Sequence, residues 1–116
     1  MSLQNMFNVA VKGLSSQDFN RSMDEHGGAC MFRGAHGLKC AIGHCLNDDE
    51  ICMSPGGLEI VESTNHFAAL KYNVPLDDVL RLQACHDRAS PYDRNMKTLL
   101  ITFAADNRLE LPDELK

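Results

Sequence analysis

The chain has 116 residues, of which 44% are hydrophobic and 23% are charged. These proportions are ordinary for a globular protein and argue against global disorder, and the length predicts a single domain spanning residues 1–116. The formal net charge is −5, and the 11 basic residues are scattered along the chain without forming a cluster. We therefore expect no direct binding of nucleic acid, which requires a basic face.

The sequence also predicts a protein that stays in the compartment where it is made. No apolar run approaches the roughly 20 residues that cross a bilayer, so we expect no membrane association. Residues 1–14 lack the basic start and continuous apolar stretch of a signal peptide. The 5 cysteines are an odd number, which predicts reduced thiols in a reducing, cytoplasmic compartment.

The first predicted helix covers residues 3–13. Its apolar residues recur at helical spacing, Ser2 is placed to cap its start, and Gly13 is expected to end it. Further along, two short apolar runs, at residues 29–33 and 38–42, flank a turn that contains two glycines. Two such runs around a short turn predict a cysteine-bearing β-hairpin over residues 29–42.

Three further helices are expected in the second half of the chain. The spacing of apolar residues predicts one over residues 65–72 and another that opens at Pro75 and continues to Cys85. The sequence Ser90-Pro91-Tyr92-Asp93 has the cap, proline and acid of a helix start, and this last helix is expected to end at Asn107. The predicted fold class is α+β, mostly helical, with about four helices packed around one short β-hairpin.

Two motifs resemble a pattern in small uncharacterised proteins of phages and bacterial prophages. The first is Cys30-Met31-Phe32-Arg33-Gly34 followed by Gly37-Leu38-Lys39-Cys40-Ala41-Ile42-Gly43, similar to a Cys-aromatic-Arg-Gly strand followed by Gly-x-Lys-Cys-Ala-x-Gly. The second is Leu82-Gln83-Ala84-Cys85-His86-Asp87, similar to a helix with Leu-Gln-x-x-His-Asp. The resemblance implies a protein of a phage or mobile element that acts in the bacterial cytoplasm, and it implies no established activity.

Cysteine and histidine supply candidate ligands for zinc and candidate groups for thiol catalysis. The candidate metal or thiol site consists of Cys30, Cys40, Cys45, His86 and Asp87. A thiol enzyme would use Cys40 or Cys45 as nucleophile and His86 as base, oriented by Asp87. However, the chain contains no Cys-x-x-Cys pair, and cysteine often packs as a small buried hydrophobe. We therefore expect no cofactor, with zinc as the alternative.

The leading functional hypothesis is a non-enzymatic interaction protein. Small size, an acidic surface and the resemblance favour an accessory protein of a phage or mobile element that binds a host or defence protein and modulates or inhibits it. The expected interaction surface joins the predicted hairpin turn and an acidic step, with residues Arg33, His36, Asp48, Asp49 and Glu50. The alternative is a small Cys/His metalloprotein or thiol-dependent enzyme that uses Cys40 or Cys45 with His86, and the oligomeric state stays open.

Overall fold

A computed structural model describes residues 2–24, 30–90 and 95–116. Across these residues the chain forms helices and no strand, so the fold is all-α and the predicted α+β class is wrong. The α-helices are α1 (Leu3–Ser16), α2 (Ala41–Cys45), α3 (Val61–Tyr72), α4 (Leu76–Asp87) and α5 (Met96–Asp106). Three short 3-10 helices join them: η1 (Ala35–Gly37), η2 (Asp48–Glu50) and η3 (Asp113–Leu115).

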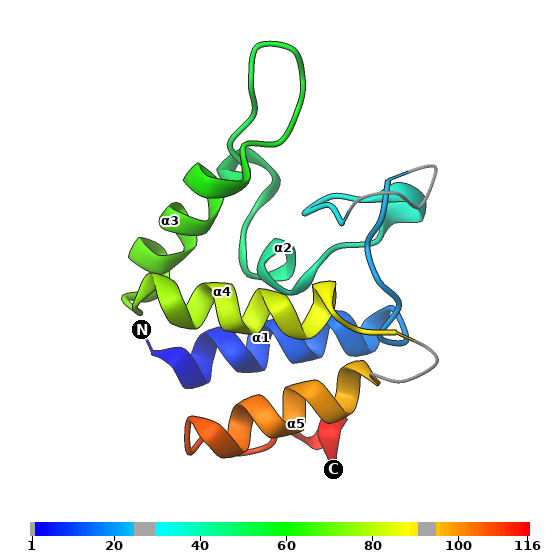
Figure 1. The fold of residues 1–116 in the computed structure, drawn as a ribbon, viewed down its shortest axis with the longest axis vertical. Helices are drawn as coiled ribbons and strands as arrows, with labels where there is room; N and C mark the ends of the chain where they lie inside the picture. The colour runs from blue at the N-terminus through cyan, green and yellow to red at the C-terminus, as the bar shows by residue number, and fades with distance from the viewer. Residues whose placement is uncertain (1, 25–29, 91–94) are drawn as a thin grey trace.

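Helices α1, α4 and α5 form the body of the molecule, with α2 and α3 at one end of it (Figure 1). Helix α2 packs against both α1 and α4, α3 and α5 each pack against α4, and η3 returns to α1. The rings of Phe7 and Phe103 stack with their centroids 5.6 Å apart, which joins α1 to α5 through the core. No helix among the described residues is long and apolar enough to cross a membrane.

Helix α1 begins as predicted and continues past its predicted end. The Ser2 hydroxyl accepts a hydrogen bond from the Asn5 amide at 3.1 Å, which confirms the cap. Gly13 does not end the helix, which continues to Ser16. The glycine lies inside the helix because the ring of His44 packs directly against its Cα, where a side chain would overlap the ring.

The predicted hairpin over residues 29–42 is the main error, although its first residue, Ala29, lies outside the described residues. One isolated bridge between Arg33 and Lys39 is all the strand pairing found inside the described part of this segment. Helix η1 occupies the turn, and the second apolar run enters α2. Residues 40–43 are all buried, so this run does not alternate between core and solvent as a half-buried strand does.

Long polar side chains take over the backbone hydrogen bonds that a hairpin would have made. The Glu59 carboxylate accepts from the Phe32 and Arg33 amides, each at 2.9 Å. The Gln17 side chain accepts from the Lys39 amide at 3.1 Å and donates to its carbonyl at 2.7 Å. Because buried backbone groups need partners, these contacts hold the segment without a sheet.

The last three helices agree with the sequence except at their starts. Helix α3 was predicted from residue 65 and begins at Val61, while α4 matches its predicted range closely. The proposed start Pro91-Tyr92-Asp93 lies outside the described residues. The described part of α5 is capped by Asn95, whose side chain accepts from the Thr98 amide at 3.3 Å.

Candidate functional site

Arg33 is predicted as an exposed contact residue, but its side chain forms hydrogen bonds with the C-terminal end of α2. Its guanidinium donates to the carbonyls of Gly43 at 2.7 Å and Leu46 at 2.8 Å, and it pairs with the Asp48 carboxylate at 2.7 Å. The Arg33 side chain retains only 23% of its exposure. These bonds satisfy carbonyls at the C-terminal end of a helix, which have no partner within the helix, so Arg33 has a structural role.

The acidic step at residues 48–50 forms η2 and is only partly free for contacts. Glu50 closes a capping box with Asn47 and also accepts from the Lys71 ammonium at 2.7 Å, which ties η2 to α3. The Lys71 ammonium and the Asn47 amide hold the pKa of Glu50 below its usual range. Asp49 and His36 are exposed, Asp48 pairs with Arg33, and Arg33 and Glu50 are engaged in contacts within the fold.

The structure brings together three of the five residues of the predicted metal or thiol site. One ligand atom from each of Cys30, His86 and Asp87 lies within 4.8 Å of the others. His86 and Asp87 end α4, while Cys30 lies before η1 and forms an isolated bridge with Met23. The Cys30 sulfur also lies 3.5 Å from the sulfur of Met23.

Both ring nitrogens of His86 are already in use. Nε2 accepts from the Ser22 amide at 2.8 Å, so Nδ1 carries the proton and donates it to the Asp87 carboxylate at 2.8 Å. The ring is fully buried. His86 therefore joins Ser22 to α4 through one ring nitrogen and contacts Asp87 through the other.

The cysteines have the properties of buried thiols. Burial, and secondarily the Asp87 carboxylate, raises the pKa of Cys30 to about 11. Burial also raises the pKa values of Cys40 and Cys45 to about 12. The Cys45 thiol donates to the Met6 carbonyl at 3.4 Å inside the core. Since the thiolate is the nucleophile, these raised pKa values weigh against thiol catalysis.

A different exposed surface stands out, and the sequence analysis did not identify it. Among the described residues, eight large hydrophobic side chains are exposed, and six of them lie between residues 53 and 70. We call these six the outer apolar surface. They belong to the loop before α3 and to α3 itself: Met53, Leu58, Ile60, Val61, Phe67 and Leu70.

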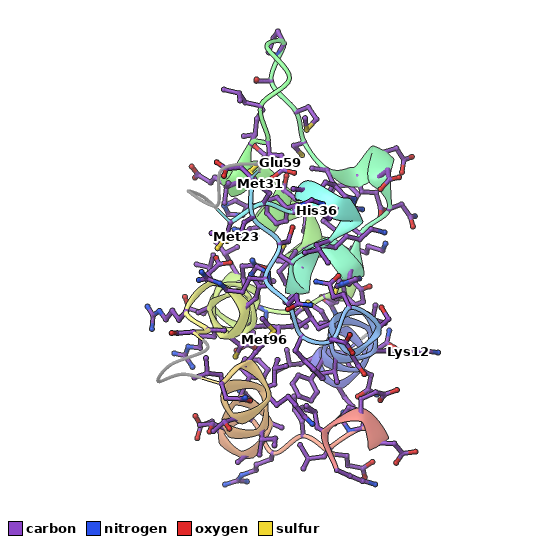
Figure 2. All side chains as sticks on the ribbon, turned by 90° about the vertical axis from the view of Figure 1, so that its right-hand side faces the viewer. Lys12, Met23, Met31, His36, Glu59 and Met96 are labelled. Atoms are coloured by element: carbon purple, nitrogen blue, oxygen red, sulfur yellow. The ribbon has the colours of Figure 1, made fainter. Side chains whose placement is uncertain are left out.

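The loop that carries half of this surface projects beyond the body of the molecule (Figure 1). A bridge between Met53 and Glu59 closes its base, and the Ser54 amide donates to the Leu58 carbonyl at 2.7 Å across its tip. Leu58 is 71% exposed on this closed loop. Figure 2 shows Glu59 beside Met31 at the same end of the molecule, where its carboxylate holds the Phe32 and Arg33 amides.

Beyond its first residue, Val61, helix α3 exposes one pair of large apolar side chains. Phe67 and Leu70 are separated by three positions and are therefore neighbours on the helix surface, with Leu70 82% exposed. Thr64, Ala68 and Tyr72 occupy the opposite, buried face. In the sequence, the only signal for this surface is that α3 has apolar residues on both of its faces. An interpretation from periodicity alone assigns such apolar residues to the buried core, so it does not identify the surface.

Comparison with protein-family models, with curated proteins and with solved structures finds no match to this chain.

Proposed function

We propose that this chain is an accessory protein of a phage or mobile element that works by binding a host or defence protein, which it modulates or inhibits in the bacterial cytoplasm. The outer apolar surface carries this proposal. Exposed hydrophobic residues are common singly, but their concentration on one loop and one helix is typical of protein interaction sites. In this proposal the partner contacts Leu58 and Leu70, because Arg33 and Glu50 are engaged in the fold.

The hydrogen bonds of the loop support the same proposal. Besides the contact across its tip, the Ile60 amide donates to the Cys52 carbonyl at 2.7 Å, and the Cys52 amide donates to the Thr64 hydroxyl at 3.0 Å. These contacts hold the loop against the start of α3. A loop that is already ordered loses little conformational freedom on binding, and this preserves affinity.

The test is capture of partners from a bacterial host lysate by tagged protein. We expect a stoichiometric partner for the wild type and loss of that partner with Leu58→Ser/Leu70→Ser. The matched control is Leu80→Ser/Ile101→Ser, which removes two exposed apolar side chains outside the surface, 45% and 37% exposed. A partner that is retained by the first variant, or lost equally with the control, would contradict the proposal.

A second candidate function is a metal site at Cys30, His86 and Asp87, favoured by the approach of their ligand atoms to within 4.8 Å. Zinc bound there would join Cys30 to α4. A structural zinc site has four protein ligands, and the cluster supplies three. If Nδ1 of His86 bound the metal, it would have to lose the proton that it donates to Asp87. If Nε2 bound the metal, it would have to give up the hydrogen bond from the Ser22 amide. These two requirements make this the second candidate.

Metal analysis of the purified protein tests the second candidate directly. It predicts about one zinc ion per chain, lost in Cys30→Ser and retained in Cys52→Ser. Cys52 is a matched control because it is also a partly buried free cysteine and lies outside the cluster. If protein expressed in zinc-supplemented medium contains no zinc after purification, the metal site is excluded and the interaction proposal is unaffected.

A further inference from the structure

The negative charge of the protein is concentrated in one part of the chain. Residues 47–78, which we call the acidic segment, contain seven acidic residues and one basic residue, so their net charge is −6. The remaining residues contain nine acidic and ten basic residues, so their net charge is +1. The acidic segment runs from η2 through α3 to the first turn of α4, and it contains the whole outer apolar surface.

The charge of this segment is only partly compensated, and one of its acids, Asp48, pairs with Arg33 from outside the segment. Its single cation, Lys71, is paired with Glu50 at 2.7 Å. Asp49, Glu62 and Asp77 are exposed, and within the described parts of the chain none of their carboxylates takes part in an ion pair. These acids lie in η2, in α3 and in the first turn of α4, and α3 also carries side chains of the outer apolar surface, so acidic and apolar groups belong to the same part of the chain.

We infer that the outer apolar surface binds a protein whose own contact surface is basic around an apolar centre. The inference rests on the proposed function and identifies the class of partner. Complementary charge around an apolar contact guides association and rejects wrong partners. The net negative charge of the acidic segment disfavours phosphate-bearing ligands such as nucleic acids and anionic membranes, and a second copy of the chain would oppose acid to acid.

The test uses two synthetic helical peptides, one of leucine and lysine and one of leucine and glutamate in the same pattern. Binding is measured by fluorescence anisotropy in about 50 mM and about 300 mM NaCl. We expect the lysine peptide to bind at least about tenfold more tightly than the glutamate peptide in low salt, with most of this difference lost in high salt. Equal binding of the two peptides, or binding of neither, would overturn the inference.

Charge-neutralised variants locate the effect. Asp49→Asn/Glu62→Gln should weaken binding of the lysine peptide about threefold or more. The control, Asp106→Asn/Glu110→Gln, removes two exposed acids outside the acidic segment, changes the net charge equally, and should alter binding by less than about twofold. Equal weakening by both variants would attribute the effect to net charge and overturn the inference. Circular dichroism confirms that each variant is folded.

Failure of this inference is distinguishable from failure of the proposed function. If Leu58→Ser/Leu70→Ser loses the lysate partner while the peptides show no charge preference, the interaction proposal stands and the partner class is wrong. Analytical ultracentrifugation tests whether a second copy of the chain occupies the outer apolar surface. We expect the protein to be a monomer. A concentration-dependent dimer that Leu58→Ser/Leu70→Ser abolishes would assign the surface to a second copy and overturn the inference.

Discussion

At the scale of single residues, side chains remote in sequence decide how the centre of the chain folds. Glu59 holds the amides of Phe32 and Arg33, and His86 holds the amide of Ser22. The sequence singled out His86-Asp87 as candidate site residues. It could not reveal Glu59, because its hydrogen-bond partners lie 26 and 27 residues away and nothing in its local pattern differs from that of a solvated acid.

Replacing the Glu59 carboxylate tests the importance of this contact. In Glu59→Gln, one amide oxygen remains and the NH₂ group faces a backbone donor, so we expect a loss of about 1–3 kcal/mol in the free energy of unfolding. Urea denaturation measures this loss. The matched control is Glu62→Gln, an exposed acid with no ion pair among the described residues, which should change stability by less than about 0.5 kcal/mol. Equal stability of the two variants would rule out the role assigned to Glu59.

His44 predicts a pH dependence of stability. Burial, helped by the charges of Lys39 and Arg33, lowers its pKa from 6.5 to about 4, so the folded protein keeps the ring neutral. Between these two pH values the unfolded chain binds a proton that the folded chain does not, so stability falls as the pH drops. Because the ring is partly exposed, we expect a loss of only about 1–2 kcal/mol.

Unfolding measured from pH 7 to pH 4.5 in the wild type and in His44→Gln checks this prediction. Glutamine still donates toward Gln17, the present partner of His44 Nε2 at 2.8 Å, but it does not take up a proton. The carboxylates titrate in both proteins, so the difference between the two profiles isolates the histidine. Parallel profiles would show that His44 does not cause the dependence.

At the scale of elements, the sequence predicted the helices with an amphipathic face and a defined start. Helix α4 has the clear apolar stripe that periodicity detects, and α1 has its serine cap. The short helix α2 was missed because its five residues are too few to show a helical period. Its apolar run has the length of a strand, and only the tertiary partners of residues 38–42 exclude that alternative.

Gly13 in α1 yields a prediction that runs against helix propensity. Glycine to alanine inside an exposed helix is worth about 1 kcal/mol of added stability. Here the new methyl group would overlap the ring and Cβ of His44, so we expect Gly13→Ala to destabilise by about 1–3 kcal/mol.

A double-mutant cycle with His44→Ala isolates the contact. Once the ring is removed, Gly13→Ala should become neutral or stabilising, which thermal unfolding of the four proteins detects. The same destabilisation by Gly13→Ala in both backgrounds would show that the close approach of His44 does not explain the glycine.

At the scale of the whole molecule, composition indicated a small acidic globular chain, and no helix in the described part of the chain is long and apolar enough to span a membrane. The sequence gives the net charge, but it does not show which surface of the folded protein carries that charge. Only the structure shows that the acidic segment also carries exposed apolar side chains, on α3 and on a loop that projects beyond the body (Figure 1). The predicted contact residues were chosen for their charge, and the fold uses Arg33 and Glu50 internally.

Hydrogen exchange on the complex with the captured partner tests the docking surface most directly. We predict that partner binding slows exchange in peptides covering residues 52–70, while peptides from α5, on the opposite side of the body, exchange as in the free protein (Figure 1). Protection confined to α5 or to the residues around His86, with no change over residues 52–70, would contradict the account.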